Sequence, residues 1–424
     1  MKSVYKKTVL DSGIRVVTER ISSFRSISIG FWVNVGSRDE RQQESGISHV
    51  IEHMAFKGTK RRSAKEIAQS LESLGGHLNA FTGREQTCYY ARVLDEHLPE
   101  AVDVLADLIR NSNLSPADLQ KEKKVILEEI KDVQDNPGDL VHDLYAMTLW
   151  KDQPIGRPVI GNSETVSSFR RRDLLEFMRL NYQSAGIVVA ASGNISHDRL
   201  VELVERKLKI DHQDGRVRLP RKNPSSFKEI KLFKRKSAQT HVCLGVPAFK
   251  YSHPQRYALT LLNIVLGGGM SSHLFQTIRE KLGLAYSIYS FVDFLEDTGT
   301  WGIYLATDAR QVPKAVTFSL KELKKIKRKL LTRSELLHAK EQLKGNIVIS
   351  FENSSNRMNR LARNELYLKR YIPLEQSMKE IEKTTSEDIQ VVANQLLQTE
   401  RLTAVVLGPV ENGLQRGLES SLDH

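Results

Sequence analysis

Two histidines and a glutamate in the segment HVIEHMAFKGT, residues 49–59, have the spacing of a metal site that activates water. On a helical wheel His49, Glu52 and His53 share one face, and four apolar residues occupy the opposite face. Two imidazoles at positions i and i+4 can bind one cation at about 2.0 to 2.1 Å each, and the carboxylate between them can hold a water bound to that cation. The alternative is a helix whose polar face is merely solvated. The glutamate favours the metal site, because His-x-x-Glu-His is the inverted motif of certain zinc peptidases.

A second helix offers candidates for the third protein ligand that a catalytic zinc site needs. The run SPAD at Ser115 predicts its start, with a capping hydroxyl, a proline in the first turn and an acid three residues after the cap. Along this helix Glu122 and Glu129 fall on one stripe with Val125 and other apolar residues, whereas Glu128 falls among lysines and faces water. Two carboxylates on a buried stripe are costly unless they bind a cation or hydrogen-bond donors. A partly solvated groove is the alternative.

Two further segments carry residues suited to binding a peptide. GGHLNAFT, residues 75–82, predicts a tight turn followed by an extended segment that contains Asn79 and Ala80, and an open strand edge can recruit a peptide as an added strand. An ordinary core strand is the alternative. In residues 266–290, three glycines precede Arg279 and Tyr286, and no Gly-Lys-Ser/Thr follows them, so they do not form a phosphate loop. A flexible loop packed against a helix is the alternative there.

Strands followed by helices predict an α+β architecture in two domains. A chain of 424 residues exceeds the usual size of a single core. The polar segment 211–226 has the composition of a linker, so we expect one domain at 1–215 and another at 216–424. Residues 114–130 are echoed by 331–347, which indicates a weak internal duplication in which only the first half keeps the metal motif. The expected strands are 14–18 and 27–35, and the expected helices are 44–56, 63–74, 95–111 and 115–134.

Composition limits the class of protein more than its activity. The net charge is +12, but the basic residues occur in short clusters without interleaved aromatic residues, so we expect no binding of nucleic acid. Cys88 and Cys243 are too few and too far apart for a disulfide framework or a thiolate zinc site. No window approaches 18 uninterrupted apolar residues and the N-terminus lacks the core of a signal peptide. We therefore expect a cytoplasmic protein without a membrane span.

The motifs together resemble the pitrilysin/insulinase family of zinc metallopeptidases, nearest to the mitochondrial processing peptidase and its bacterial homologues. The resemblance rests on HVIEHMAFKGT, on GGHLNAFTGREQTCYYARV at 75–93, on the glutamate 76 residues after His53, and on IREKLGLAYSIYS at 278–290. It extends over nearly the whole chain. It implies that His49, His53 and Glu129 bind one zinc ion per chain, that Glu52 is the general base, and that Glu122 supports the site from outside the ligand set.

The same resemblance implies a fold, a substrate and a partner. The fold would consist of two homologous α/β-layer domains of the LuxS/processing-peptidase-like type, closing as a clamshell on dimerisation. Asn79 and Ala80 would pair with a peptide or an unfolded protein segment. Arg279 and Tyr286 would contact the substrate, with the tyrosine hydroxyl near the scissile carbonyl, where one oxyanion donor is typically worth about 3 to 4 kcal/mol. In double-length relatives this pair faces zinc held by the other half, so we expect a homodimer in which it acts on the partner's zinc site.

These features favour a zinc endopeptidase of the processing type. In this hypothesis Glu52 takes the proton from the attacking water and returns it to the leaving amine. The principal alternative is a non-catalytic relative that acts as a structural or substrate-binding subunit, like the core proteins of respiratory complexes in the same superfamily. A basic nucleic-acid-binding protein is the second alternative, and it predicts salt-sensitive binding to DNA or RNA.

Overall fold

The protein forms two compact units. The computed structural model describes residues 3–210, 221–410 and 413–423. Unit 1 comprises Met1–Lys131, Arg157–Arg221 and Val348–Tyr371, and unit 2 comprises Asp132–Gly156, Lys222–Ile347 and Ile372–His424. The predicted domain boundary near residue 215 falls within 211–220, which lies outside the described residues, and it stays a prediction.

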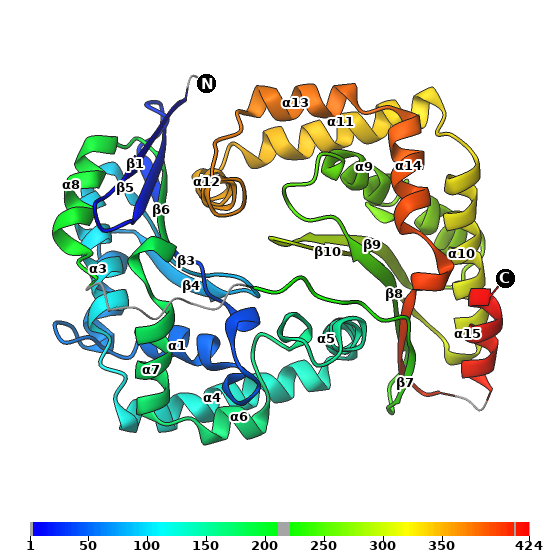
Figure 1. Ribbon diagram of the computed structural model, residues 1–424, viewed down its shortest axis with the longest axis horizontal. Coiled ribbons are helices and arrows are strands. Elements are labelled where there is room, and N and C mark those ends of the chain that lie inside the picture. Colours follow the sequence, from blue (N-terminus) through cyan, green and yellow to red (C-terminus); the bar gives the residue numbers. More distant parts are fainter. Residues whose placement is uncertain (1–2, 211–220, 411–412, 424) are drawn as a thin grey trace. The chain divides into compact units, whose positions relative to one another are not determined.

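A six-stranded sheet forms the centre of unit 1 (Figure 1), with the order β1-β2-β6-β3-β5-β4. The pair β2 and β6 is parallel, and all other neighbours are antiparallel. The central strands are rich in β-branched, aromatic and small apolar residues and are buried on both faces, whereas β4 alternates at the edge. The strands are β1 (Val4–Val9), β2 (Arg15–Arg20), β3 (Ser26–Val33), β4 (His77–Thr82), β5 (Thr87–Leu94) and β6 (Ile187–Gly193).

Unit 2 repeats this pattern with one strand fewer. Its sheet has the order β7-β11-β8-β10-β9, in which β7 and β11 are parallel and the remaining neighbours are antiparallel. Strand by strand, this order matches β2-β6-β3-β5-β4 of unit 1. The matching topology supports the predicted duplication and the α+β class. The strands are β7 (Ile230–Lys234), β8 (Thr240–Ala248), β9 (Ser287–Phe294), β10 (Gly299–Thr307) and β11 (Thr403–Gly408).

The four helices predicted from the sequence are present as α1 to α4, within a few residues of the expected bounds, whereas the pattern does not predict α5 to α8. Ser115 accepts a hydrogen bond from the Asp118 amide at 3.1 Å, as expected of the predicted cap. The helices are α1 (Ile47–Ala55), α2 (Ala64–Glu72), α3 (Leu98–Asn111), α4 (Pro116–Asp135), α5 (Pro137–Trp150), α6 (Ser163–Ser168), α7 (Arg171–Asn181), α8 (His197–Lys207), α9 (Arg256–Gly267), α10 (Val312–Arg328), α11 (Arg333–Ser350), α12 (Ser354–Leu368), α13 (Leu374–Lys383), α14 (Ser386–Leu396) and α15 (Leu414–Asp423).

Each sheet is covered on one face by a helix from the other half of the sequence. In unit 1, α12 packs on β2, β3 and β6 and buries Met358 and Leu361 against Trp32 and its neighbours. In unit 2, α5 packs on β8 and β11 and buries Tyr145 and Trp150. The two units are therefore not contiguous in sequence.

Two further expectations can be compared with the described residues. Cys88 and Cys243 are both free and buried, in agreement with the absence of a disulfide framework. Within the described part of the chain, the helices lack the length and apolar character needed to cross a bilayer.

Candidate metal and peptide-binding site

The helix α1 carries the His-x-x-Glu-His motif, and its apolar face fixes its orientation. Ile47, Val50, Ile51 and Met54 are at most 1% exposed and pack in the main core of unit 1. The helix starts after Gly46, whose φ of 92° lies in the left-handed region that favours glycine. With the apolar face buried, the motif residues must point to the other side of the helix, as the wheel predicts.

The two imidazoles of α1 and one carboxylate of α4 converge on one point. The Nε2 atoms of His49 and His53 lie 3.9 and 3.6 Å from the same oxygen of Glu129, and one ligand atom from each of the three residues lies within 4.8 Å of the others. Ligand atoms lie about 2.0 to 2.2 Å from a zinc ion. Two ligands of one ion are therefore separated by a few ångströms, as the imidazole nitrogens and the Glu129 oxygen are here. Two imidazoles and a carboxylate also form a typical catalytic zinc set, so the residues fit the ion.

Glu122 supports this cluster from beside His53. Its Oε2 lies 3.4 Å from His53 Nδ1, and its other oxygen is 2.9 Å from Lys57 Nζ. A carboxylate on the far nitrogen of an imidazole fixes the ring orientation and leaves the near nitrogen to bind a metal. Glu122 is only 6% exposed, whereas Val125 is 45% exposed. The predicted buried stripe is therefore wrong at Val125, because this residue lies about 60° around the helix from Glu122, at the edge of the stripe.

The environment of His49 keeps its ring neutral. Burial, together with the neighbouring imidazole of His53, lowers the pKa of His49 to about 4. Metal ligands must be deprotonated, so at neutral pH this ring is in the form that binds a cation. In one respect His49 departs from usual metal-binding histidines, since its Nδ1 is buried without a hydrogen-bond partner among the described residues.

Glu52 is held against the end of the edge strand β4. Its Oε2 accepts a hydrogen bond of 2.6 Å from the Thr82 hydroxyl, and the Thr82 amide also hydrogen bonds to it. Burial raises the pKa of Glu52, and these two bonds from Thr82 oppose the rise. A carboxyl group with a raised pKa is suited to accept a proton and then to donate it.

The strand β4 presents an open edge beside α1. It pairs with β5 on one side only, and α1 packs against it. The Ala80 amide donates to the Asn79 side chain at 2.8 Å, so it points away from β5. Because alternate residues of an antiparallel strand face the same side, Leu78, Ala80 and Thr82 present their main-chain groups to the open edge. The arrangement allows a peptide to be added as a strand.

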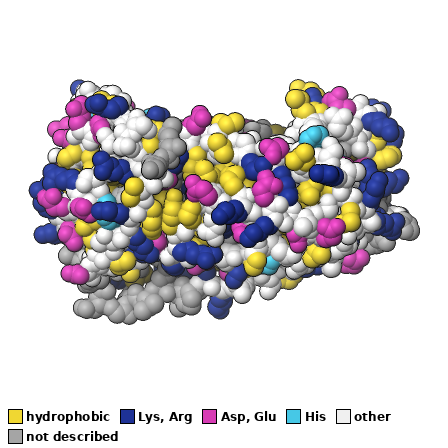
Figure 2. Space-filling model, turned by 90° about the horizontal axis from the view of Figure 1, so that it is seen from above, with side chains coloured by type: hydrophobic (Ala, Val, Ile, Leu, Met, Phe, Trp, Pro, Cys, Tyr) yellow, Lys and Arg dark blue, Asp and Glu magenta, His cyan; other side chains and the backbone are white. Residues whose placement is uncertain are grey.

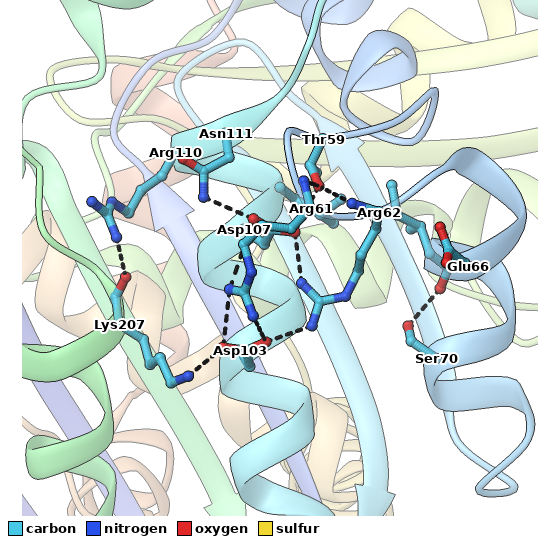
Figure 3. A network of polar contacts seen from close by, with 12 residues as sticks. Thr59, Arg61, Arg62, Glu66, Ser70, Asp103, Asp107, Arg110, Asn111 and Lys207 are labelled. Carbon is cyan, nitrogen blue, oxygen red and sulfur yellow. Dashed lines mark hydrogen bonds and ion pairs between the residues drawn. The ribbon is translucent and has the colours of Figure 1, made fainter.

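An ion-pair network on α3 anchors the loop that follows α1 (Figure 3). Asp103 binds three cations and Asp107 accepts a hydrogen bond of 2.7 Å from Thr59. The loop residues Arg61 and Arg62 reach back to this helix, which fixes the chain just beyond the motif. The cations around Asp103 are Arg61, Arg62 and Lys207.

Arg279 and Tyr286 lie together on the surface of unit 2. The guanidinium of Arg279 stands 5.8 Å from the ring centroid of Tyr286, which is 74% exposed. Arg279 belongs to a π-helix, η6 (Phe275–Lys281), and π-helical turns occur frequently at functional sites. Within this unit the pair is available for contact with another molecule.

Comparison with known proteins assigns the chain to a family. The model of the insulinase family, peptidase family M16, matches residues 15–163, and the model of the peptidase M16 inactive domain matches residues 168–343. A protein of Mycobacterium tuberculosis named an uncharacterized zinc protease is 41% identical over 98% of this chain and 95% of its own length. The chain belongs to the M16 peptidase family. A Bacillus subtilis member, also named an uncharacterized zinc protease, is 39% identical over 96% of this chain and 99% of its own.

Solved structures show that this M16 family member has a known fold. A protease from Helicobacter pylori superposes with a TM-score of 0.90 at 23% identity, covering 96% of this chain and 100% of its own. A structure described as the peptidase M16 inactive domain from Pseudomonas fluorescens gives a TM-score of 0.88 at 21% identity, covering 96% and 98%. At these identities the likeness concerns the fold, which confirms two homologous α+β domains.

Three residues of the site in this M16 family member were not singled out from the sequence. Thr82 holds Glu52, Lys57 holds Glu122, and Glu40 accepts hydrogen bonds from the first amides of α1. Lys57 follows His53 by four residues and the helical period would have indicated it. No local signal joins Thr82 or Glu40 to α1, because their contacts depend on how the chain folds back.

Proposed function

We propose that this protein is a zinc-dependent endopeptidase that cleaves peptides or unfolded polypeptide segments. The observation that carries the proposal is the convergence of His49, His53 and Glu129 on one point, with Glu52 on the same face of α1. Membership of a family of zinc proteases supports it. The bound zinc ion would supply Lewis acidity toward a water molecule and toward the scissile carbonyl.

The side chains of the chain itself then have distinct tasks. Glu52 accepts a proton from the attacking water and delivers it to the leaving amine, held in place meanwhile by Thr82. Glu122 keeps the His53 ring turned toward Glu129. Ala80 presents its main-chain groups to the open edge, where a peptide can pair as a strand, whereas the main chain of Asn79 faces β5 and its side chain accepts the Ala80 amide. Strand pairing needs an extended backbone, so the expected substrates are unfolded segments rather than folded proteins.

Arg279 and Tyr286 complete the proposal as donors to the developing oxyanion. The guanidinium and the phenol lie close together on unit 2 and are exposed. We infer that they act on the zinc site of a second protomer in a homodimer that closes around the substrate. The predicted zinc stoichiometry of one ion per chain belongs to the same proposal, as does a cytoplasmic location.

The principal alternative is a non-catalytic relative that binds or supports other chains. The match of the second half to an inactive-domain model fits this alternative as well as it fits an enzyme whose first half holds the metal. A nucleic-acid-binding role has less support, because basic side chains are interspersed with acidic and apolar ones on the face shown in Figure 2.

Replacing Glu52 with glutamine tests the proposal. The variant should keep its zinc, because the substitution leaves the three ligands intact, while hydrolysis of a quenched unstructured peptide should fall by at least about a hundredfold. The matched control is Glu128→Gln. Glu128 lies on the exposed side of α4 and forms an ion pair with Lys131. Unchanged hydrolysis by Glu52→Gln would exclude the proposed base, and a zinc-loaded wild-type protein without hydrolysis would favour the non-catalytic alternative.

A further inference from the structure

Four charged side chains form a buried clamp in unit 1: Arg38, Asp39, Glu85 and Arg221. Arg38 donates to Glu85 at 2.6 Å, and Arg221 donates to the two oxygens of Asp39 at 3.0 and 2.8 Å. None of the four side chains is more than 6% exposed. The two positive and two negative charges offset one another, and Glu85 is also hydrogen bonded to Tyr367. Replacing one member removes part of this compensation from the buried charges that remain.

The clamp joins segments that are far apart in the sequence. The amides of Ser37 and Arg38 donate to the carbonyls of Gly83 and Arg84, in the turn between β4 and β5, at 3.2 and 2.8 Å. Arg221 donates to the Glu85 carbonyl in the same turn at 2.6 Å. The approach of the two backbones is so close that a Cβ at Gly36 would lie 2.2 Å from the Gly83 oxygen. Only glycine fits at that position.

Both elements that carry the proposed catalytic groups are attached to this clamp. Thr82, which binds Glu52, directly precedes the clamped turn. Glu40 directly follows Asp39, and its carboxylate accepts hydrogen bonds from the amides of Gly46 and Ser48 at 2.8 and 2.9 Å, at the start of α1. A shift of the clamp would therefore move the end of β4 and the beginning of α1 together.

The chain passes from unit 1 into unit 2 directly after Arg221. We propose that Arg221 and the clamp couple this crossover to Glu52 through the β4–β5 turn and Thr82, so that the catalytic base is correctly placed only while the crossover is clamped. The inference rests on the function proposed for Glu52. Arg38, Glu85 and Arg221 are positioning residues in this account, because they act through Thr82 and not on the substrate.

Amide hydrogen exchange of the metal-free full-length chain tests the physical coupling without any catalytic assay. Arg221→Met keeps the aliphatic stem and removes the guanidinium, and it should speed exchange about tenfold or more in peptides covering 78–86 and 46–50. Arg206→Met on the exposed face of α8 is the matched control and should leave these rates unchanged. Faster exchange only in the residues that follow 221 in the sequence would overturn the coupling, and so would faster exchange spread equally over both units. If Arg221→Met does not fold, the neutral double variant Asp39→Asn/Arg221→Gln takes its place in the same assay.

Kinetics then test the consequence for the base. Arg221→Met should lower kcat by roughly tenfold to a hundredfold, with KM within about twofold, because a small misplacement of a reacting group costs rate rather than binding. Thr82→Val removes the hydroxyl bond to Glu52 and leaves only the bond from the amide. In this background Arg221→Met should cause a smaller further loss of kcat than it does in the wild type. Equal losses in both backgrounds would contradict the route through Thr82. An inactive wild type together with the expected exchange pattern would refute the proposed peptidase function and leave the clamp intact.

Discussion

At the residue scale, the carboxylates of unit 1 differ in character because their surroundings differ. Burial raises the pKa of Glu52, against hydrogen bonds from Thr82. Burial also raises the pKa of Glu40 to about 8, although the amides of Ser48 and Gly46 favour its charged form. Asp103 shows the opposite result, because the bonds from Arg61, Lys207 and Arg62 outweigh burial and hold its pKa well below its ordinary value. The raised pKa of Glu52 suits proton transfer, and the lowered pKa of Asp103 suits a structural anchor.

Replacing Asp103 with asparagine should destabilise unit 1 while leaving the metal-binding residues in place. The free energy of unfolding near pH 7 should fall by about 2 kcal/mol, because three cations lose their shared partner. The pKa of Asp103 is depressed in the folded protein, so its stabilisation is present above the unfolded pKa and is lost as pH falls. Denaturant unfolding measured at several pH values should show the difference between wild type and variant shrinking below about pH 4.

The control for this prediction is Asp198→Asn. Asp198 pairs with Lys6 at 3.3 Å, but its side chain is 81% exposed. An exposed pair of this kind contributes about 0 to 1 kcal/mol, so the control should change the unfolding free energy by less than Asp103→Asn does. Equal effects of the two substitutions would contradict the anchoring role of the network on α3.

The sequence predicts the residues of the candidate site better than it predicts their supports. His49, Glu52 and His53 share a local helical period, and Glu122 and Glu129 share another, so their common faces follow from spacing alone. The hydrogen bond from Thr82 to Glu52 and the ion pair between Arg221 and Asp39 join positions that are distant in sequence, and no local period encodes them.

At the element scale, the open edge of β4 makes a specific prediction about peptide recognition. A peptide added as a strand would bond through every second residue, because only alternate residues of β4 face the edge. Scanning a peptide substrate with single N-methylated amides should therefore give losses in kcat/KM that recur with a period of two. Each lost bond should cost about tenfold, which corresponds to about 1.4 kcal/mol. Losses without this alternation would indicate recognition through side chains.

The helices and strands predicted in the first half follow from local signals, whereas their packing does not. The cap at Ser115 and the apolar stripe of α4 lie within one segment, and the observed helix Pro116–Asp135 agrees with them. The covering of β3 and β6 by α12, more than a hundred residues later in the chain, depends on long-range packing. The apolar residues of α12 predict a buried face but not which sheet buries it.

At the scale of the whole molecule, the candidate metal-binding residues and the candidate oxyanion donors belong to different units. Unit 1 holds the cluster of His49, His53 and Glu129, and unit 2 holds Arg279 and Tyr286. The position equivalent to Glu129 in the second half is Asn346, and that half has no His-x-x-Glu-His motif. The proposal of one metal site per chain, completed by Arg279 and Tyr286 of a second protomer, builds on this division.

Mixing two inactive variants tests whether Tyr286 acts on the partner's site. Glu52→Gln lacks the base and Tyr286→Phe lacks the phenol, and each should be nearly inactive alone, since one oxyanion donor is worth about a hundredfold or more. After exchange of protomers, the mixture should recover about a quarter of the wild-type activity, because half of the dimers are hybrids and each hybrid carries one intact site. No recovery would mean that both residues serve the same protomer. Mixing Glu52→Gln with Glu129→Gln is the control and should stay inactive.

Zinc binding by two neighbouring variants of α4 tests most directly whether the three residues hold a metal. Glu129 faces both imidazoles, whereas Glu128 is exposed on the same turn. Competition with a chelator should show one tightly bound zinc ion per chain for the wild type and for Glu128→Gln. Glu129→Gln should bind zinc at least about a hundredfold more weakly, because it loses a ligand and not only a supporting residue. Equal zinc affinities for Glu129→Gln and the wild type would contradict the proposed metal site and the peptidase mechanism built on it.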